Sequence, residues 1–258
     1  MIKLEDIFNA KTQSAFVRTK QADYAQRTER FFTQKYPHLN RTLDHNQHRK
    51  VIDLSYKRAK QRGFKTEREH WRFLVIVANC GSFFDDDPQY YSSLRTARWV
   101  QPTGEKTYHP YFPTLTSALQ SRRTQIQRDF EDTQRVLNGF QQIYSRPRPV
   151  NSAAIATALH NCWPHQVTAL HETDLRLFIE QSADLAQNRY GFSGSDMSGS
   201  DVLCITCLGL VLGLYFLSDP LFPWARDALQ QQDASQRRHA LGEGALGYAQ
   251  ALAGIQNE

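Results

Sequence analysis

An eight-residue pattern occurs twice in this chain, and it limits the possible folds more than any other feature. Residues 81–88 read Gly-Ser-Phe-Phe-Asp-Asp-Asp-Pro and residues 213–220 read Gly-Leu-Tyr-Phe-Leu-Ser-Asp-Pro, so Gly, Phe, Asp and Pro match at an offset of 132. Shorter matches occur upstream in the same order: Arg62-Gly63-Phe64 with Tyr190-Gly191-Phe192, and Pro37-His38 with Pro164-His165. Collinear self-similarity indicates a duplicated structural unit. We therefore expect two tandem copies of a helical unit, residues 1–150 and 151–258, packed as one globular body.

Apolar residues recur at helical spacing along most of the chain, which predicts an all-α fold. Thr66 with Glu69 three residues later forms a capping-box pattern ahead of the apolar stretch 71–80. Asp44 can cap a second helix, which Gly63 ends. The other expected helices cover about residues 12–35, 115–144, 153–159, 175–190, 201–217 and 236–255. No stretch shows the sustained alternation that is typical of a half-buried strand.

Residues 202–217 form a nearly continuous apolar stretch and raise the question of a membrane segment. The stretch is 16 residues long, whereas a membrane-spanning helix needs about 20. Asp201 precedes it, Ser218-Asp219-Pro220 follows it, and no cluster of Lys or Arg flanks it. We therefore interpret it as a helix buried at the centre of the protein, and we expect no membrane partner.

Composition and charge are those of a globular protein with two unlike halves. Of 258 residues, 22% are charged and 40% are hydrophobic, and a chain of this length can bury a sizeable core. The chain starts with acidic residues where an export signal needs basic ones, and its four cysteines do not form a disulfide framework, so we expect a cytoplasmic location. Residues 1–150 contain 26 Lys and Arg against 15 Asp and Glu, a net charge of +11, while residues 151–258 contain 5 against 11, a net charge of −6.

The aspartates that end the repeated pattern are interpreted as turn residues. A proline disfavours helical conformation in the residue before it, and an Asp there can bond to its own backbone in an Asx turn. The structural turn residues are therefore Gly81, Asp87, Pro88, Gly213, Asp219 and Pro220. Three carboxylates occur in a row at residues 85–87, but successive side chains point apart, and of these only Asp87 has an Asp counterpart in the second copy. We expect no metal site.

Motifs for catalysis or cofactor binding do not occur in the sequence. It contains no Gly-x-Ser-x-Gly, no phosphate-binding glycine loop and no His-Glu-x2-His. The spacing of His160, Cys162 and His165 does not match the paired ligands of a zinc site. Cys204 and Cys207 lie in the apolar stretch, where two small hydrophobic side chains facing a core explain them. We therefore expect no enzyme and no cofactor, and we assign no catalytic residue.

A basic stretch in the first half leaves nucleic-acid binding as a distant alternative. Its members are Arg49, Lys50, Lys57, Arg58, Lys60, Arg62, Lys65 and Arg68. Some of these side chains could form a stripe that contacts phosphates. A solvated helix face has the same composition, and Glu67 and Glu69 interrupt the run, so nucleic acid is the less favoured partner.

The segment between about residues 88 and 113 is the best candidate for a protein interface. It has no counterpart in the second copy, and we expect it to be a long loop that concentrates aromatic rings. Long loops without regular structure tend to be functional, and Tyr, Trp and Arg are typical of interface hot spots. The candidate partner-binding residues are Tyr90, Tyr91, Arg95, Arg98, Trp99, Tyr108 and Tyr111. The alternative is that these rings cover one end of the helical core.

The second half resembles a group of small helical proteins encoded beside type VI secretion effectors. Their pattern is Tyr-Gly-Ile, an apolar helix, and then Gly-x-x-Phe-Asp-x-Asp-Pro-x-x-Pro-Trp-Ala. In this chain Tyr190-Gly191-Phe192 precedes an apolar helix, and Tyr-Phe-Leu-Ser-Asp-Pro-Leu-Phe-Pro-Trp-Ala follows at residues 215–225. The first half keeps Gly63-Phe64 and Asp87-Pro88 but has Tyr91-Ser-Ser where Pro-Trp-Ala is expected.

This resemblance implies a protein partner, either a secreted effector toxin or a component of its delivery. The most concrete expectation is a cytoplasmic immunity protein that holds a cognate toxin inactive. A chaperone or adaptor that loads the effector is the alternative, and nucleic-acid binding through the basic half is more distant. The resemblance leaves the toxin's chemistry and the oligomeric state open.

Overall fold

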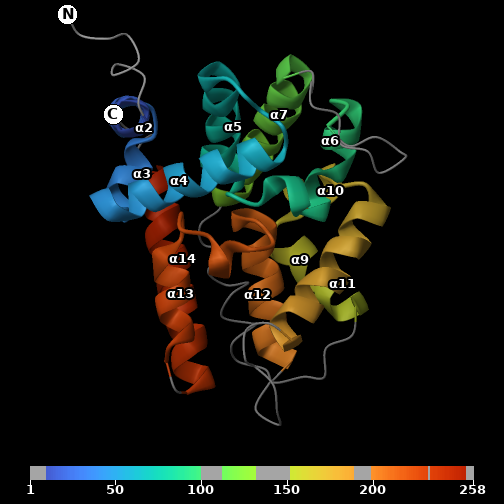
Figure 1. Ribbon diagram of the computed structural model, residues 1–258. Helices are drawn as coiled ribbons and strands as arrows, with labels where there is room; N and C mark the ends of the chain where they lie inside the picture. The colour runs from blue at the N-terminus through green and yellow to red at the C-terminus, as the bar shows by residue number, and fades with distance from the viewer. Residues whose placement is uncertain (1–9, 100–111, 132–151, 189–198, 232, 254–258) are drawn as a thin grey trace, which may run out of the picture.

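The computed structural model describes residues 10–99, 112–131, 152–188, 199–231 and 233–253, and the regular elements in these ranges are all helical (Figure 1). The elements before residue 132 are α2 (Ala10–Lys35), α3 (Pro37–Thr42), α4 (His45–Gln61), α5 (Glu67–Cys80), the 3-10 turns η1 (Phe84–Asp86) and η2 (Pro88–Tyr90), α6 (Tyr91–Thr96) and α7 (Phe112–Glu131). Those after residue 151 are α9 (Ser152–Cys162), α10 (Pro164–Ala169), α11 (Glu172–Asn188), α12 (Gly199–Leu212), η3 (Phe216–Ser218), α13 (Pro223–Leu229) and α14 (Ala234–Ala253). The predicted all-α fold is confirmed.

Capping boxes read from the sequence begin two of the helices. At the start of α4, Asp44 accepts a hydrogen bond from Gln47 N at 2.8 Å, and at the start of α5, Thr66 Oγ1 accepts one from Glu69 N at 3.2 Å. In both cases the side chain of the third helical residue bonds back to the backbone of the cap, so two free N–H groups are satisfied together. Gly63 joins the two helices with a φ of 85°, a conformation that glycine adopts readily, and α5 packs back against α4.

The helices of the two halves agree in order and in length. Helices α3 and α10 have six residues each and begin with a proline. Helices α4 and α11 have 17 residues each, α5 and α12 have 14 each, and a 3-10 turn of three residues follows both α5 and α12. A duplication predicts this agreement, and the duplication itself stays a prediction.

One continuous hydrophobic core connects the two halves, with α5 and α12 at its centre. Side chains of these two helices that solvent does not reach include Phe73, Leu74, Val77, Cys204, Cys207 and Leu210. All four cysteines are buried and free of disulfides. Helix α7 packs against α5 and α10, and α14 packs against α3 and α13. The boundary near residue 150 therefore does not separate two independent cores.

The apolar stretch 202–217 is buried as expected, but it is not a single helix. Helix α12 ends at Leu212, and Gly213 has a φ of 101°, through which a right-handed helix cannot continue. The remaining apolar residues form a turn that leads into η3. In the described parts of the chain, no helix combines the length and the apolar character that crossing a membrane requires.

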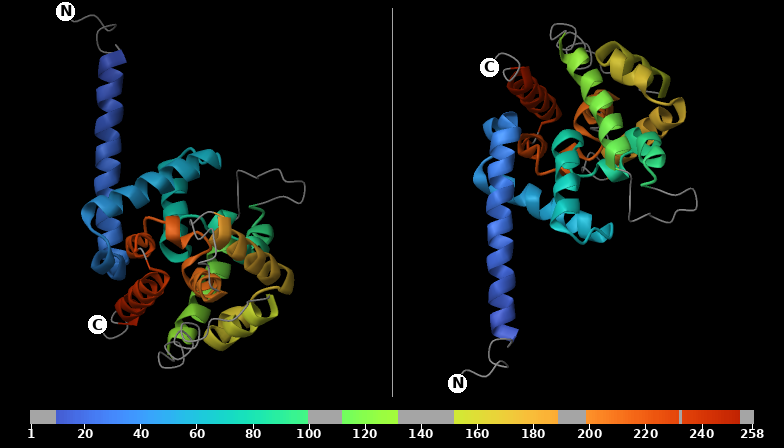
Figure 2. Two further views of the ribbon diagram at one scale, coloured as in Figure 1. Left: turned by 90° about the horizontal axis from the view of Figure 1, so that it is seen from below. Right: turned by 90° about the horizontal axis from the view of Figure 1, so that it is seen from above.

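Helix α2 extends well beyond the rest of the molecule. Figure 2 shows its N-terminal end projecting away from the other helices, whereas its C-terminal part lies against α3 and α4. The packed part contains Tyr24 and Phe32, both buried. This packing brings α2 beside the cleft between α4 and α5.

Candidate functional site

The two copies of the repeated pattern bind each other in the middle of the molecule. The carboxylate of Asp219 accepts hydrogen bonds from Ser82 N and Ser82 Oγ, both at 2.6 Å. The carboxylate of Asp87 accepts one from Leu214 N at 2.7 Å. Ser82 and Leu214 occupy the equivalent position, directly after the glycine of each pattern. Each aspartate therefore holds the turn of the opposite copy.

Each aspartate also bonds to its own turn, which confirms the predicted Asx turns. Asp87 Oδ1 accepts from Gln89 N at 3.1 Å, and Asp219 Oδ1 accepts from Leu221 N at 3.0 Å. Burial raises the pKa of Asp87 to about 6, against the opposing effect of its hydrogen bonds from Leu214 and Gln89, and burial also raises the pKa of Asp219. These buried, fully bonded carboxylates serve the fold.

Asp85 and Asp86 pair with two arginines of α4. Arg58 and Arg62 each contact both carboxylates, with Nη2 atoms 2.7 and 2.6 Å from the two oxygens of Asp86. The guanidinium group of Arg58 also lies 4.8 Å above the centre of the Phe83 ring. Two cations thus balance two carboxylates. Among the described residues, no group of three or more His, Cys, Asp or Glu is placed to hold a metal ion.

The same contacts weaken the case for a basic stripe that binds phosphates. Arg58 and Arg62 are nearly covered and are engaged by acidic side chains, so they have little charge to offer a nucleic acid. The neighbouring cations Lys57, Lys60 and Lys65 are exposed. They belong to solvated helix faces, and Lys60 and Lys65 also line a pocket between α2, α4 and α5.

The aromatic segment after Pro88 is partly helical and partly buried, which corrects the prediction of a long exposed loop. Tyr90 is 2% exposed and Trp99 is 3% exposed. The Trp99 ring centre lies 5.4 Å from that of Phe64 and 5.6 Å from that of Phe84. A covered ring has no surface to offer a partner. Tyr90 and Trp99 are therefore core residues, in line with the alternative that these rings close one end of the core.

The other predicted interface residues differ in their surroundings. Tyr91 is half-buried at the start of α6, and its hydroxyl donates to Asp86 O at 3.3 Å. Arg95 pairs with Asp174 of α11 at 3.2 Å, and Arg98 is exposed. Tyr108 and Tyr111 lie outside the described residues. Tyr91, Arg95 and Arg98 are the described members of the set that solvent reaches.

The residues that carry the resemblance in residues 213–225 act in the scaffold. Pro223 is the first residue of α13, and Ala225 is fully buried. The ring of Trp224 lies directly on Gly244 of α14, where an added Cβ would come within 2.1 Å of the ring. The Pro-Trp-Ala part of the pattern therefore joins α13 to α14.

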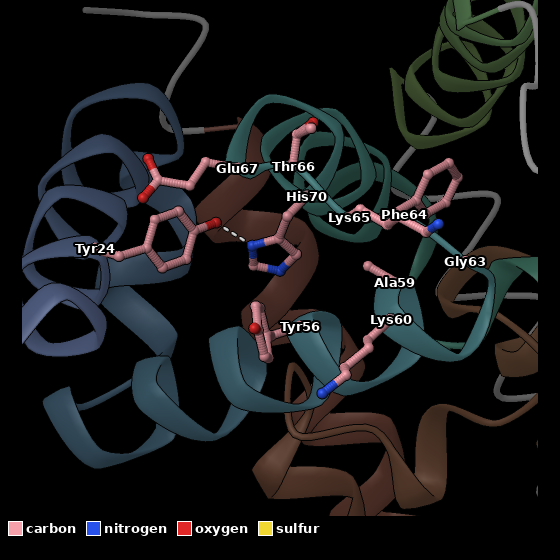
Figure 3. A pocket seen from close by; sticks show the side chains of 10 residues that line it. All are labelled: Tyr24, Tyr56, Ala59, Lys60, Gly63, Phe64, Lys65, Thr66, Glu67 and His70. Carbon is pink, nitrogen blue, oxygen red and sulfur yellow. Dashed lines mark hydrogen bonds between the residues drawn. The ribbon is translucent and has the colours of Figure 1, made fainter. Parts of the chain in front are cut away.

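A cavity of about 560 Å³ opens between α2, α4 and α5 and is the candidate functional site (Figure 3). It lies within the size range of small-molecule sites in proteins. Its lining residues are Tyr24, Tyr56, Ala59, Lys60, Gly63, Phe64, Lys65, Thr66, Glu67 and His70. We call it the Tyr24–His70 pocket.

His70 is the buried polar group of this pocket. His70 is 4% exposed, its Nδ1 bonds to Tyr24 Oη, and its Nε2 has no hydrogen-bond partner among the described residues (Figure 3). Burial lowers the pKa of His70 to about 4 and raises the pKa of Tyr24 to about 12. At neutral pH the imidazole is thus uncharged while the phenol keeps its proton. Because a phenol is a stronger hydrogen-bond donor than a neutral imidazole N–H, we assign Tyr24 as the donor to Nδ1, which places the imidazole hydrogen on Nε2.

The rim of the Tyr24–His70 pocket carries a positive charge excess. Lys60 and Lys65 are exposed and form no ion pair with any residue in the described ranges. Glu67 is the acidic lining residue, and it pairs with Arg27 of α2 at 3.2 Å. The two unpaired ammonium groups favour an anionic ligand.

Sequence reasoning did not single out this site. Tyr24, Tyr56 and His70 come from three different helices and share no motif. The one available signal is a histidine on the apolar stripe of residues 66–80, and a lone histidine at such a position is also explained by ordinary core packing.

Removing His70 should reduce the loss of stability at acid pH. The folded state holds the pKa of His70 near 4, below the unfolded value near 6.5, so the unfolded chain binds the extra proton as pH falls through this range. The free energy of unfolding of the wild type should therefore fall by on the order of 2 kcal/mol more than that of His70→Gln between pH 7 and pH 4. Urea titrations at both pH values measure the difference. Asp87, whose raised pKa acts in the opposite direction, is common to both proteins, so equal pH dependence would contradict a buried neutral His70.

Comparison with known protein families, with curated proteins and with solved structures finds no match to this chain.

Proposed function

We propose that the protein is a non-enzymatic binding protein of a bacterial type VI secretion effector module, and more concretely a cytoplasmic immunity protein that holds a cognate toxin inactive. The supporting observation is the role of the residues that carry the resemblance. Asp219, Trp224 and Ala225 are engaged within the fold, so the shared pattern specifies a scaffold rather than a reaction centre. We therefore assign the function of the protein to its surface, where a partner protein would bind.

The partner surface is proposed to include α6 and the segment that follows it in the chain. Tyr91, Arg95 and Arg98 supply the described part, and Tyr108 and Tyr111 lie between α6 and α7 in the sequence. Tyrosine and arginine are frequent among the residues that contribute most binding energy at protein interfaces. A tyrosine ring covers a large area with few rotatable bonds, and an arginine offers several hydrogen-bond donors. The projecting helix α2 offers a second, elongated surface (Figure 2).

A chaperone or adaptor role is the closest alternative, because it also requires binding to the effector. Nucleic-acid binding is less favoured, because Arg58 and Arg62 of the basic stretch are paired with Asp85 and Asp86. The two protein-binding roles differ in one measurable property. An immunity protein abolishes the toxin's activity, whereas a chaperone binds a delivery segment and leaves the activity intact.

Coexpression with the product of the adjacent effector gene tests the proposal. We expect the cells to survive and the two proteins to copurify as a complex without toxin activity. A complex that retains toxin activity would support the chaperone role instead. Absence of any complex would contradict both roles.

Variants in the aromatic segment locate the interface. Tyr108→Ala and Tyr111→Ala should each weaken the complex by about 30-fold, the effect of losing about 2 kcal/mol at a hot spot. Lys57→Ala, which changes an exposed residue of α4, is the matched control and should bind like the wild type. Wild-type affinity in both tyrosine variants would exclude this segment as the interface.

A further inference from the structure

The Tyr24–His70 pocket contains a hydrogen-bond donor for which the residues that the structure describes supply no acceptor. With Tyr24 assigned as the donor to Nδ1, the hydrogen of the His70 imidazole is on Nε2, and Nε2 makes no hydrogen bond within the described ranges of the chain. Buried polar groups are nearly always hydrogen-bonded, because an unsatisfied donor destabilises the folded state. Because this donor lies beside a cavity, a bound ligand could supply its acceptor.

The Nε2 atom of His70 is covered by neighbouring side chains, so a ligand in the pocket reaches it only when one of them moves. Figure 3 shows Nε2 on the side of the imidazole away from Tyr24, toward the space between Tyr56 and Lys60. The Tyr56 ring stands at 88° to the imidazole, with ring centres 5.2 Å apart. An aromatic ring is at best a weak acceptor. Tyr56 is 45% exposed, so its ring has room to turn aside and let a stronger acceptor reach Nε2.

The charges around the pocket select an anion over a neutral acceptor. Lys60 and Lys65 line it without ion pairs to the described residues, while the single lining carboxylate, Glu67, is paired with Arg27. A carboxylate has two oxygens, so one can accept from Nε2–H while the other faces an ammonium group.

The remaining lining selects the body of the ligand. Tyr24, Tyr56 and Phe64 provide aromatic walls, and Ala59 adds a small apolar surface. A bare inorganic anion would leave these walls in contact with water, and a hydrocarbon would leave Nε2–H without an acceptor. A flat ring covers the walls and packs favourably against other aromatic rings.

We propose that the Tyr24–His70 pocket binds a small organic anion in which an aromatic ring carries a carboxylate. The ring lies against the aromatic walls, and the carboxylate meets His70 Nε2 and the Lys60 ammonium group. This site goes beyond the proposed binding of an effector and does not depend on it, because the residues of the pocket and those of the α6 segment are different.

Titration of the full-length protein with phenylacetate tests this proposal. The matched controls are 2-phenylethanol, which has the ring without the charge, and acetate, which has the charge without the ring. Calorimetry should show phenylacetate binding at least about tenfold more tightly than either control, which corresponds to about 1.4 kcal/mol. In nitrogen NMR spectra the His70 Nε2 resonance should shift on addition of phenylacetate. Equal binding of phenylacetate and 2-phenylethanol, or an unchanged Nε2 resonance at saturation, would overturn the proposal.

Substitutions separate the pocket from the rest of the surface. Lys60→Gln should weaken phenylacetate binding about threefold, as expected for one partly exposed charge, whereas Lys57→Gln on the same helix should have no effect. Tyr24→Phe keeps the aromatic wall but removes the hydroxyl that directs the imidazole hydrogen to Nε2. It should weaken binding and change the two His70 nitrogen resonances toward a mixture of tautomers. Phenylacetate affinity equal to that of the wild type in both Lys60→Gln and Tyr24→Phe would place the ligand elsewhere.

Discussion

Replacing Asp219 with alanine should lower the free energy of unfolding by about 3–5 kcal/mol, because three buried donors lose their acceptor at once and each unsatisfied donor costs about 1–3 kcal/mol. The donors are Ser82 N, Ser82 Oγ and Leu221 N. Two of them belong to the opposite copy of the repeated pattern, so the loss loosens the contact between the turns that follow α5 and α12 as well as the local turn. Urea unfolding followed by circular dichroism measures the change.

Two other aspartate substitutions serve as comparisons for Asp219→Ala. Asp87→Ala should have a similar effect, because Asp87 holds Leu214 N and Gln89 in the equivalent way. Asp227→Ala, at an exposed position of α13, should change stability by no more than about 0.5 kcal/mol. An effect of Asp219→Ala below about 1 kcal/mol would mean that the carboxylate acts only as a local cap and that the bond to Ser82 contributes little.

Replacing Gly81 with alanine should lower the free energy of unfolding by about 2–4 kcal/mol. Gly81 has φ of 91° and ψ of 157°. Residues other than glycine adopt this backbone conformation only at a cost of about 1–3 kcal/mol. An added Cβ would also lie 3.1 Å from Leu212 O and 3.3 Å from Asp219 Oδ2, so it would press against the carboxylate that binds Ser82. Thermal and urea unfolding of the variant measure both effects together.

Two further glycines provide graded controls. Gly213→Ala has the same kind of backbone strain but more room, with the nearest atom at 3.4 Å, so its cost should be smaller than that of Gly81→Ala. Gly247→Ala lies in α14 with nothing within 4 Å of the added Cβ, and it should raise stability by about 0.5–1 kcal/mol because alanine favours a helix. Equal effects of Gly81→Ala and Gly247→Ala would contradict the close approach of the two turns.

The most reliable sequence predictions concerned features set by neighbouring residues. The start of α5 at Thr66 and Glu69, the start of α4 at Asp44, and the Asx turns at Asp87 and Asp219 each depend on bonds that span two or three residues. Such bonds need only residues that are close in the sequence, so the spacing of a short motif can predict them. The extent of the apolar stretch 202–217 likewise predicted burial, because its length is too short for a membrane and its composition too apolar for a surface.

Only the tertiary structure decided which residues meet across the molecule. Tyr90 and Trp99 are residue types typical of an interface, but both are buried in the core. Trp99 packs against Phe64, Phe73 and Phe84. An aromatic side chain lowers the free energy equally well by covering a core or by covering a partner, so its position in the sequence does not distinguish the two.

The sequence by itself therefore determined the helical class, the helix caps and the identity of the turn residues, because these depend on local spacing. The tertiary structure decided that Asp219 binds Ser82, 137 residues away, and that Tyr24 and His70 meet in one pocket. Contacts of this kind depend on how whole helices dock, and docking is set by the summed burial of many apolar side chains rather than by any short motif.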